Sequence, residues 1–256
     1  MKRPAFRLAL IDLDGTLYVG KQPVEGAPEA VERIRARGLT VRFTTNTDSM
    51  PPDAVVAKLN AFGIAARPGD VVTPLALAQQ LFADHRRARV LTVAAPPVRE
   101  FLRDHLAMPG DQPTHVLVAD PSFGAGYAEL DAAFRAVRGG ARLVATQTGR
   151  WVRREDGDHL DTGGWVRLLE YATETDALVL GKPSLDFFRL ALEGAGVPAA
   201  ETVVVGDDRA SDIAGGRAAG AHTVLVGTGK GGGAAGPDPD VVIASIADLP
   251  ALLDAR

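Results

Sequence analysis

Cysteine is absent from this chain of 256 residues. Its absence excludes disulfide bonds, thiolate catalysis and metal sites with cysteine ligands, and it is compatible with a reducing compartment. Long hydrophobic runs are also missing, because no segment approaches the roughly 20 apolar residues that span a bilayer. No apolar stretch typical of a signal peptide precedes the first predicted strand. We therefore expect a cytoplasmic location.

An excess of charge of one sign is missing as well. The chain has 28 Lys and Arg residues against 32 Asp and Glu residues, which gives a formal net charge of −4. Without a basic run or basic face, neither a nucleic acid nor an anionic membrane is an expected partner. The five histidines show no spacing typical of metal ligands. Apolar residues make up 46% of the chain, which is enough to fill one large or two modest domains.

Short β-branched runs alternate along the chain with segments of helical periodicity. This alternation is typical of βαβ units, so we predict an α/β fold with a doubly wound, mostly parallel, Rossmann-like core sheet. The predicted strands are 8–11, 39–44, 90–93, 115–118, 142–145, 177–180, 202–205 and 223–226. The predicted helices have one apolar face each and lie around 27–34, 55–62, 130–137 and 165–172.

The sequence pattern in the middle of the chain differs from the alternation of strands and helices elsewhere. Asp156-Gly157 stands between Trp151-Val152 and His159-Leu160, a pattern typical of a β-hairpin turn, and Pro96-Pro97, Pro109-Gly110 and Pro121 occur earlier in the same part of the chain. We therefore predict an inserted α/β domain over residues 80–175, with residues 1–79 and 176–256 forming the core domain. A glycine-rich run over 227–233 lacks the spacing of a phosphate-binding loop, which favours a mobile surface loop.

Polar residues follow several predicted core strands directly. Because the carboxyl ends of parallel strands meet at one edge of a sheet, these side chains can converge although they are far apart in the sequence. The residues are Asp12 and Asp14 after the first strand, Thr45 and Asn46 after the second, Lys182 after residues 177–180, and Asp207, Asp208 and Asp212 after residues 202–205.

This set of side chains suits phosphoryl transfer. Asp12 can serve as the nucleophile, since a carboxylate can accept a phosphoryl group. Asp14, two residues further on, can act as general acid and then as general base. Mg²⁺ would find oxygen ligands in Asp12, Asp207 and the backbone carbonyl of Asp14. Lys182 would balance negative charge, and Thr45 would donate hydrogen bonds to the phosphoryl oxygens.

Each motif also has a plainer interpretation when it is taken alone. Asp12-x-Asp14-Gly15 fits an acidic β-turn, and Gly181-Lys182-Pro183-Ser184 fits a loop before a serine-capped helix. Asp207-Asp208 fits the acidic start of a helix. The occurrence of all these motifs in one order at strand ends favours a shared site.

In these motifs the chain resembles the haloacid dehalogenase superfamily. The resemblance runs in order through Asp12-Leu13-Asp14-Gly15-Thr16, Thr45, Lys182 and the Asp207-Asp208 motif with Asp212. Phe43-Thr44-Thr45-Asn46 and Gly181-Lys182-Pro183-Ser184 further resemble the phosphatase subgroup with a large α/β cap, which includes para-nitrophenylphosphatases, pyridoxal phosphatase and the phospholysine phosphohistidine inorganic pyrophosphate phosphatase. Asp14 followed by Gly15-Thr16 resembles the phosphotransferase form more than the dehalogenase form.

The resemblance implies roles for individual residues. Asp12 would be the nucleophile and Asp14 the acid and base, with Asp12, Asp14 and Asp207 as Mg²⁺ ligands. Thr45, Asn46 and Lys182 would hold the phosphoryl group. Asp208 and Asp212 would support the metal ligands or complete the metal site. Relatives commonly pair through their caps, which implies a possible homodimer.

The cap is expected to select the substrate. Gln147, Thr148, Arg150 and Trp151 stand just before the predicted hairpin; Arg150 could pair with an anionic leaving group and Trp151 could stack on a ring. Ordinary structural packing is the alternative for both residues. The loop at Asp120-Pro121-Ser122 is a second candidate for substrate contact.

The predicted function is Mg²⁺-dependent hydrolysis of a small phosphoester, phosphoamide or pyrophosphate through an aspartyl-phosphate on Asp12. Two alternatives stay open: a phosphotransferase or mutase that passes the phosphoryl group to a hydroxyl, and a binding protein without activity. The presence of Asp12, Asp14, Lys182 and Asp207 together argues against the inactive protein.

Overall fold

The computed structural model describes residues 6–85, 87–120, 122, 124–154, 156–229 and 235–254. The chain forms two compact units. The core unit comprises residues 1–45, 53–72 and 182–256, and the cap unit comprises residues 46–52 and 73–181. Within the described residues, no helix is both long and apolar enough to cross a membrane.

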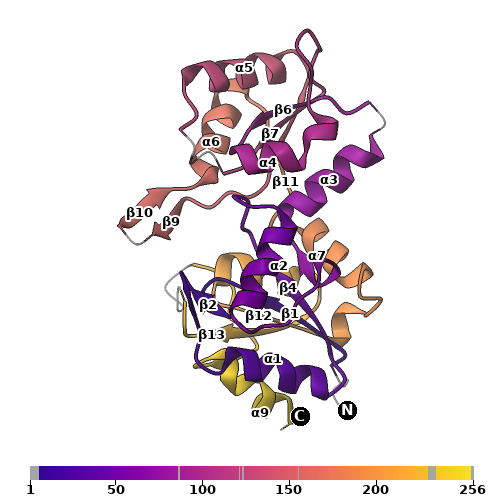
Figure 1. The fold of residues 1–256 in the computed structure, drawn as a ribbon, viewed down its shortest axis with the longest axis vertical. Helices are drawn as coiled ribbons and strands as arrows, with labels where there is room; N and C mark the ends of the chain where they lie inside the picture. Colours follow the sequence, from indigo (N-terminus) through magenta and orange to yellow (C-terminus); the bar gives the residue numbers. More distant parts are fainter. Residues whose placement is uncertain are drawn as a thin grey trace. The chain divides into compact units, whose positions relative to one another are not determined.

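The core unit is built on a parallel sheet of six strands in the order β14-β13-β12-β1-β4-β5. From β1 the chain continues to β4 and β5 on one side, and it returns later to β12, β13 and β14 on the other side, so the strand order reverses between β1 and β12. Figure 1 labels β13, β12, β1 and β4 of this sheet. Such a reversal is where open α/β sheets bind their ligands. The strands are β1 (Leu8–Asp12), β4 (Thr40–Thr44), β5 (Val71–Val72), β12 (Thr202–Gly206), β13 (His222–Val226) and β14 (Val241–Ile243).

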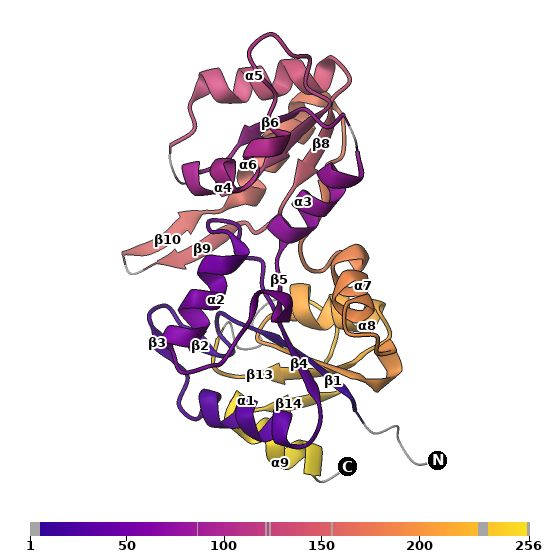
Figure 2. The same cartoon turned by 45° about the vertical axis from the view of Figure 1, so that its right-hand side comes forward.

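Helices cover the core sheet. Helix α1 packs against α9 and β4, and α7 packs against α8, as Figure 2 shows. Residues 8–11 of β1 are completely buried, as expected for a central strand covered on both faces. The core helices are α1 (Ala27–Ala36), α2 (Pro52–Ala61), α7 (Leu185–Glu193), α8 (Ala214–Ala218) and α9 (Leu249–Asp254), and a short antiparallel hairpin, β2 (Tyr18–Val19) with β3 (Gln22–Pro23), follows β1.

The cap unit has its own parallel sheet, with the strand order β11-β8-β7-β6. Helices α5 and α6 pack on each other, α5 lies against β6 and β7, and α6 against β7, around buried residues such as Val116, Leu143 and Leu169. Its elements are α3 (Pro74–Asp84), β6 (Val90–Val93), α4 (Pro96–Phe101), β7 (His115–Val118), α5 (Tyr127–Arg138), β8 (Arg142–Ala145), α6 (Thr162–Thr173) and β11 (Leu178–Val179). The predicted fold class, a mostly parallel α/β core with an inserted α/β unit, is confirmed.

A predicted hairpin is present in the cap unit. Strands β9 (Trp151–Arg154) and β10 (Gly157–Leu160) pair antiparallel, with Leu160 opposite Trp151. Gly157 lies within β10 and has a φ of 136°, a value that favours glycine. The turn signal therefore pointed to the correct place in the chain.

One predicted core strand belongs to the cap sheet. Residues 178–179 form β11, which pairs with β8, and Ala177 and Val179 pack against the apolar cluster of the cap unit. The prediction that this strand lies in the core sheet is wrong, because a short apolar run carries no information about which sheet it joins. The unit boundaries accordingly fall at Val72/Thr73 and Gly181/Lys182, whereas the sequence predicts 79/80 and 175/176.

Candidate active site

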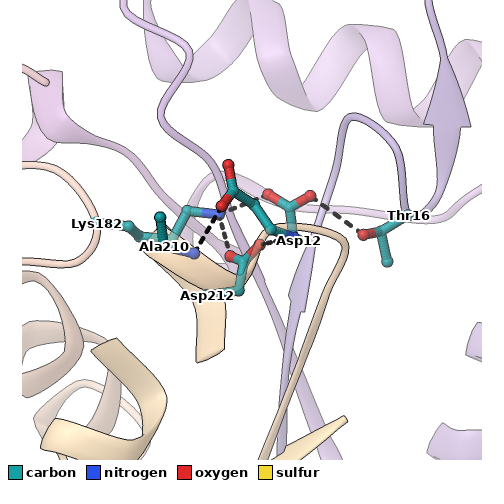
Figure 3. A network of polar contacts seen from close by, with 6 residues as sticks. Asp12, Thr16, Lys182, Ala210 and Asp212 are labelled. Atoms are coloured by element: carbon teal, nitrogen blue, oxygen red, sulfur yellow. Dashed lines mark hydrogen bonds and ion pairs between the residues drawn. The ribbon is translucent and has the colours of Figure 1, made fainter. Parts of the chain in front are cut away.

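A buried lysine lies between two buried aspartates at the end of β1 (Figure 3). The Lys182 Nζ atom donates to Asp12 Oδ1 at 2.5 Å and to Asp212 Oδ1 at 2.6 Å. Asp12 is the last residue of β1, and Asp212 lies in a short π-helix over residues 209–213 that follows β12. The three charged groups therefore meet where β1 and β12 end.

Asp207 adds a third carboxylate to this cluster. It follows β12 directly and is 5% exposed. Carboxylate oxygens of Asp12, Asp207 and Asp212 lie within 4.8 Å of one another. Three carboxylates beside one ammonium leave a local excess of negative charge, and hard carboxylate oxygens are the ligands that Mg²⁺ prefers. The donor set therefore fits a divalent cation.

Burial and mutual repulsion shift the titration of these groups. Burial raises the pKa of Asp12, the charge of Asp207 raises it further, and Lys182 opposes both effects. Burial raises the pKa of Asp212 to about 7, again against the attraction of Lys182. Burial alone would lower the pKa of Lys182, but the charges of Asp12 and Asp212 together raise it. Lys182 is therefore a permanent cation in this site.

The turn after β1 holds Asp12 from the other side. Thr16 Oγ1 donates to Asp12 Oδ2 at 3.2 Å, as Figure 3 shows. Gly15 has a φ of 85°, and its amide donates to the carbonyl of Tyr18 at 2.7 Å. A Cβ atom on Gly15 would lie 2.3 Å from Asp207 Oδ2, so only glycine fits this turn beside Asp207.

The start of the glycine-rich run contacts the same turn. Thr228 Oγ1 donates to the carbonyl of Gly15 at 2.5 Å. A Cβ atom on Gly229 would lie 2.1 Å from Asp207 Oδ2 and 2.6 Å from the Cα atom of Gly15. Residues 228–229 are therefore part of the wall of the acidic cluster, a role that the surface-loop prediction did not include; residues 230–233 lie outside the described residues.

The other residues predicted for the core site, Asp14, Thr45, Asn46 and Asp208, differ in their exposure and in their contacts. Asp14 is exposed at the turn, and Thr45, 2% exposed, follows β4 with its amide bonded to the carbonyl of Val72 at 3.2 Å. Asp208 caps the π-helix by accepting from the amide of Ala210 at 2.8 Å. Asn46 belongs to the cap unit, where its side-chain oxygen would lie 2.6 Å from a Cβ atom on Gly181.

The predicted substrate contacts of the cap unit differ in exposure. Gln147 is buried and donates from Nε2 to Asp161 Oδ1 at 2.7 Å, so this side chain is a structural link. Arg150 is exposed and Trp151 is 47% exposed, so both remain accessible to a ligand. In the second candidate loop, Asp120 accepts from the amide and hydroxyl of Ser122 at 2.9 Å each; Pro121 lies outside the described residues.

Sequence reasoning missed two neighbours of Asp14. Tyr18 is 3% exposed and forms a β-bridge with Asp14, and Lys58 of α2 places its Nζ atom 3.8 Å from the centre of the Tyr18 ring. Burial lowers the pKa of Lys58, while the charge of Asp14 opposes that effect. No local pattern distinguishes Lys58 from an ordinary exposed helix residue, whereas Tyr18 adjoins the Asp-x-Asp motif and could have been singled out.

Fold and site together define an α/β protein with an acidic centre at the switch point of its parallel sheet. The family model for haloacid dehalogenase-like hydrolases matches residues 9–106, and a second model, HAD-hydrolase-like, matches residues 179–249. Haloacid dehalogenase-like hydrolase domain-containing protein 2 from Bos taurus is 35% identical over 228 residues, covering 89% of this chain and 86% of that protein. The chain belongs to the haloacid dehalogenase-like hydrolase family.

Solved structures agree with this assignment. A p-nitrophenyl phosphatase from Archaeoglobus fulgidus superimposes with a TM-score of 0.88 at 27% identity, covering 99% of this chain and 100% of that one. A glycerol phosphate phosphatase from Mycobacterium tuberculosis, solved in complex with magnesium, has a TM-score of 0.85 at 30% identity over 97% of this chain and 78% of its own. The resemblance noted in the sequence is confirmed, and with it the prediction of a hydrolase of the phosphatase class.

Proposed function

We propose that this protein is a Mg²⁺-dependent phosphatase that hydrolyses small phosphorylated molecules through a phosphoryl group carried on Asp12. The observation that carries the proposal is the placement of Asp12, a buried carboxylate held by Lys182 and Thr16 beside Asp207 and Asp212. The magnesium complex of the M. tuberculosis relative supports the choice of cation.

In the first half of the reaction, a carboxylate oxygen of Asp12 attacks the phosphorus atom, and the bond from phosphorus to the leaving-group oxygen breaks. The exposed Asp14 carboxyl donates its proton to that oxygen. Thr45 and Lys182 donate hydrogen bonds to the phosphoryl oxygens, which carry more charge in the transition state than in the substrate. Lys182 also orients Asp12 through its 2.5 Å contact.

In the second half, Asp14 removes a proton from a water molecule that attacks the same phosphorus atom. The bond from Asp12 to phosphorus breaks, inorganic phosphate leaves and the carboxylate is restored. Asp12, Asp207 and the backbone carbonyl of Asp14 would hold Mg²⁺, and Asp212 lies close to them. The cation would supply positive charge that offsets the repulsion between the Asp12 carboxylate and the phosphate.

Phosphate release from p-nitrophenyl phosphate and glycerol phosphate in Mg²⁺ tests this proposal. Asp12→Asn is expected to lower kcat by at least about 10³-fold, because an amide is a poor nucleophile. Chelation of the cation is expected to abolish activity, and its return to restore it. Asp186→Asn is the matched control, because Asp186 is an exposed residue in the first turn of α7 that pairs with Arg189 and takes no part in the acidic cluster.

Two results would contradict the proposal. Full activity in Asp12→Asn would reject the covalent mechanism, and no phosphate release by the wild type from any phosphoester would reject the phosphatase. Appearance of the phosphoryl group on an added alcohol in preference to water would favour the phosphotransferase. A cytoplasmic location and a homodimer through the cap unit stay predictions.

A further inference from the structure

Asp48 is a buried carboxylate that the reaction described above does not use. It is 5% exposed and lies three residues after Thr45, in the segment 46–52, which belongs to the cap unit. Carboxylates are rarely buried without compensating hydrogen bonds, since the loss of hydration is costly. The contacts of Asp48 therefore indicate what the residue holds in place.

One oxygen atom of Asp48 joins three segments of the cap unit. Asp48 Oδ2 accepts from Thr146 Oγ1 at 2.6 Å and from Thr162 Oγ1 at 2.9 Å. Thr146 follows β8 and Thr162 is the first residue of α6, and both threonines are completely buried. A single carboxylate thus links segments that lie 98 and 114 residues away in the sequence.

The two threonines lead into the loop that carries the predicted substrate contacts. Next to Thr146, Gln147 donates to Asp161 Oδ1, and the same oxygen accepts from the Thr162 amide at 2.8 Å. Gln147 Oε1 in turn accepts from the amide of Gly149. Hydrogen bonds therefore hold Thr146, Gln147 and Gly149 in the loop 146–149, directly before Arg150 and Trp151.

The loop also packs tightly on the start of α6. The amide of Gly163 donates to the carbonyl of Gly149 at 2.9 Å. A Cβ atom on Gly163 would lie 2.4 Å from the carbonyl oxygen of Thr148, and one on Gly149 would lie 2.3 Å from Asp161 Oδ2. Because the backbone packs so closely, the loop has little conformational freedom when Asp48 holds Thr146 and Thr162.

We propose that Asp48 is a positioning residue for leaving-group selection: it fixes loop 146–149 and the first turn of α6 to the segment after Thr45-Asn46, and so sets where Arg150 and Trp151 lie. This inference rests on the proposed phosphatase activity. Since Asp48 acts through the loop and not on phosphorus, its loss changes the choice among esters and leaves the phosphoryl site intact.

The protonation of Asp48 depends on its burial and on the groups around it. Burial raises the pKa of Asp48 to about 7; the two threonine hydrogen bonds oppose this, and the carboxylates of Asp161 and Asp120 add to it. The two threonine hydroxyls donate to one Asp48 oxygen atom, so this position needs a hydrogen-bond acceptor.

The experiment compares Asp48→Ala with Asp48→Asn. In the asparagine variant the amide oxygen can accept from both threonines, so this variant is the conservative rescue. For Asp48→Ala, the ratio of kcat/KM for p-nitrophenyl phosphate to that for glycerol phosphate is expected to change about tenfold, mainly through KM. Inhibition by inorganic phosphate, which has no leaving group, is expected to stay within about twofold of the wild type.

Two kinetic results would overturn the inference: an unchanged ester ratio in Asp48→Ala, or an asparagine variant that behaves like the alanine variant. Thr146→Val and Thr162→Val each remove one hydrogen bond and serve if Asp48→Ala does not fold. Each is expected to shift the ester ratio in the same direction by a smaller factor.

A second measurement separates this inference from the proposed function. Hydrogen exchange at the amides of Gly149 and Gly163 is expected to accelerate at least about tenfold in Asp48→Ala and to stay slow in Asp48→Asn. Peptides covering 8–17 in the core unit are the internal control. Unchanged exchange in the loop would reject the positioning role even if the wild type hydrolysed no phosphoester.

Discussion

Thr44 is the residue before the predicted phosphate-binding Thr45, and its own hydroxyl makes no hydrogen bond within the described residues. The side chain is 1% exposed in β4, so the hydroxyl loses water without gaining a partner. Such a group costs stability. Thr44→Val keeps the shape of the side chain and is expected to raise the free energy of unfolding by about 1 kcal/mol, as measured by urea denaturation.

Thr16→Val is the matched control for this substitution. Thr16 is also completely buried, but its hydroxyl donates to Asp12 Oδ2 at 3.2 Å. Its replacement by valine is expected to lower the free energy of unfolding by about 1 kcal/mol and to lower activity. A loss of stability in Thr44→Val comparable to that in Thr16→Val would mean that the Thr44 hydroxyl has a partner after all.

At the residue scale, the sequence predicts the site residues that lie at the ends of strands. Asp12 ends β1 and Asp207 directly follows β12, so the parallel sheet itself brings them close together. Lys58 and Asp48 could not be predicted as neighbours of functional segments. Each resembles an ordinary polar residue of a helix or loop, and only contacts with distant parts of the chain distinguish them.

At the element scale, α6 ends at a residue with an unusual backbone conformation. Glu174, the C-cap of α6, has φ 56° and ψ 36°, in the left-handed region where residues with a Cβ atom are strained. Glu174→Gly is expected to raise the free energy of unfolding by about 0.5–1 kcal/mol, because glycine adopts this conformation without strain. Denaturation monitored by circular dichroism measures the change.

Glu174→Ala separates strain from the loss of the glutamate side chain. Alanine keeps the Cβ atom, so this variant is expected to have nearly the stability of the wild type. If alanine stabilised the protein as much as glycine, the strain explanation would be wrong and the gain would come from removing the carboxylate.

Some helices could be predicted from their apolar faces, whereas α3 and α7 were missed although they have 11 and 9 residues. The apolar faces around 27–34, 55–62, 130–137 and 165–172 correspond to α1, α2, α5 and α6. Strands β5 and β14 were missed, because two or three residues are too few to show periodicity. Sheet membership of β11 was also missed, since pairing depends on contacts between segments far apart in the chain.

At the scale of the whole molecule, buried carboxylates determine how stability depends on pH. The pKa values of Asp48 and Asp212 are raised to about 7 from the ordinary value of 3.8. Between these values the folded state keeps protons that the unfolded state has lost. In the presence of a chelator, the free energy of unfolding is therefore expected to fall as the pH rises from about 4 to 7, and to level off above about 8.

Asp48→Asn isolates one of these two groups. Each carboxylate contributes a slope of at most about 1.4 kcal/mol per pH unit, so the variant is expected to show a visibly smaller decline than the wild type. Urea denaturation at several pH values between 5 and 8 measures both slopes. Parallel pH curves for the two proteins would show that Asp48 titrates normally.

The sequence by itself determined the α/β class, the inserted second unit and the aspartates at the strand ends, because these depend on local periodicity and on residues that directly follow buried strands. The tertiary structure alone decided that Lys182 follows a strand of the cap sheet, that it bonds Asp212 as well as Asp12, and that Thr228 meets Gly15 across 213 residues of chain. Such contacts arise when separate segments pack together, and no local pattern reports which distant segment will be the neighbour.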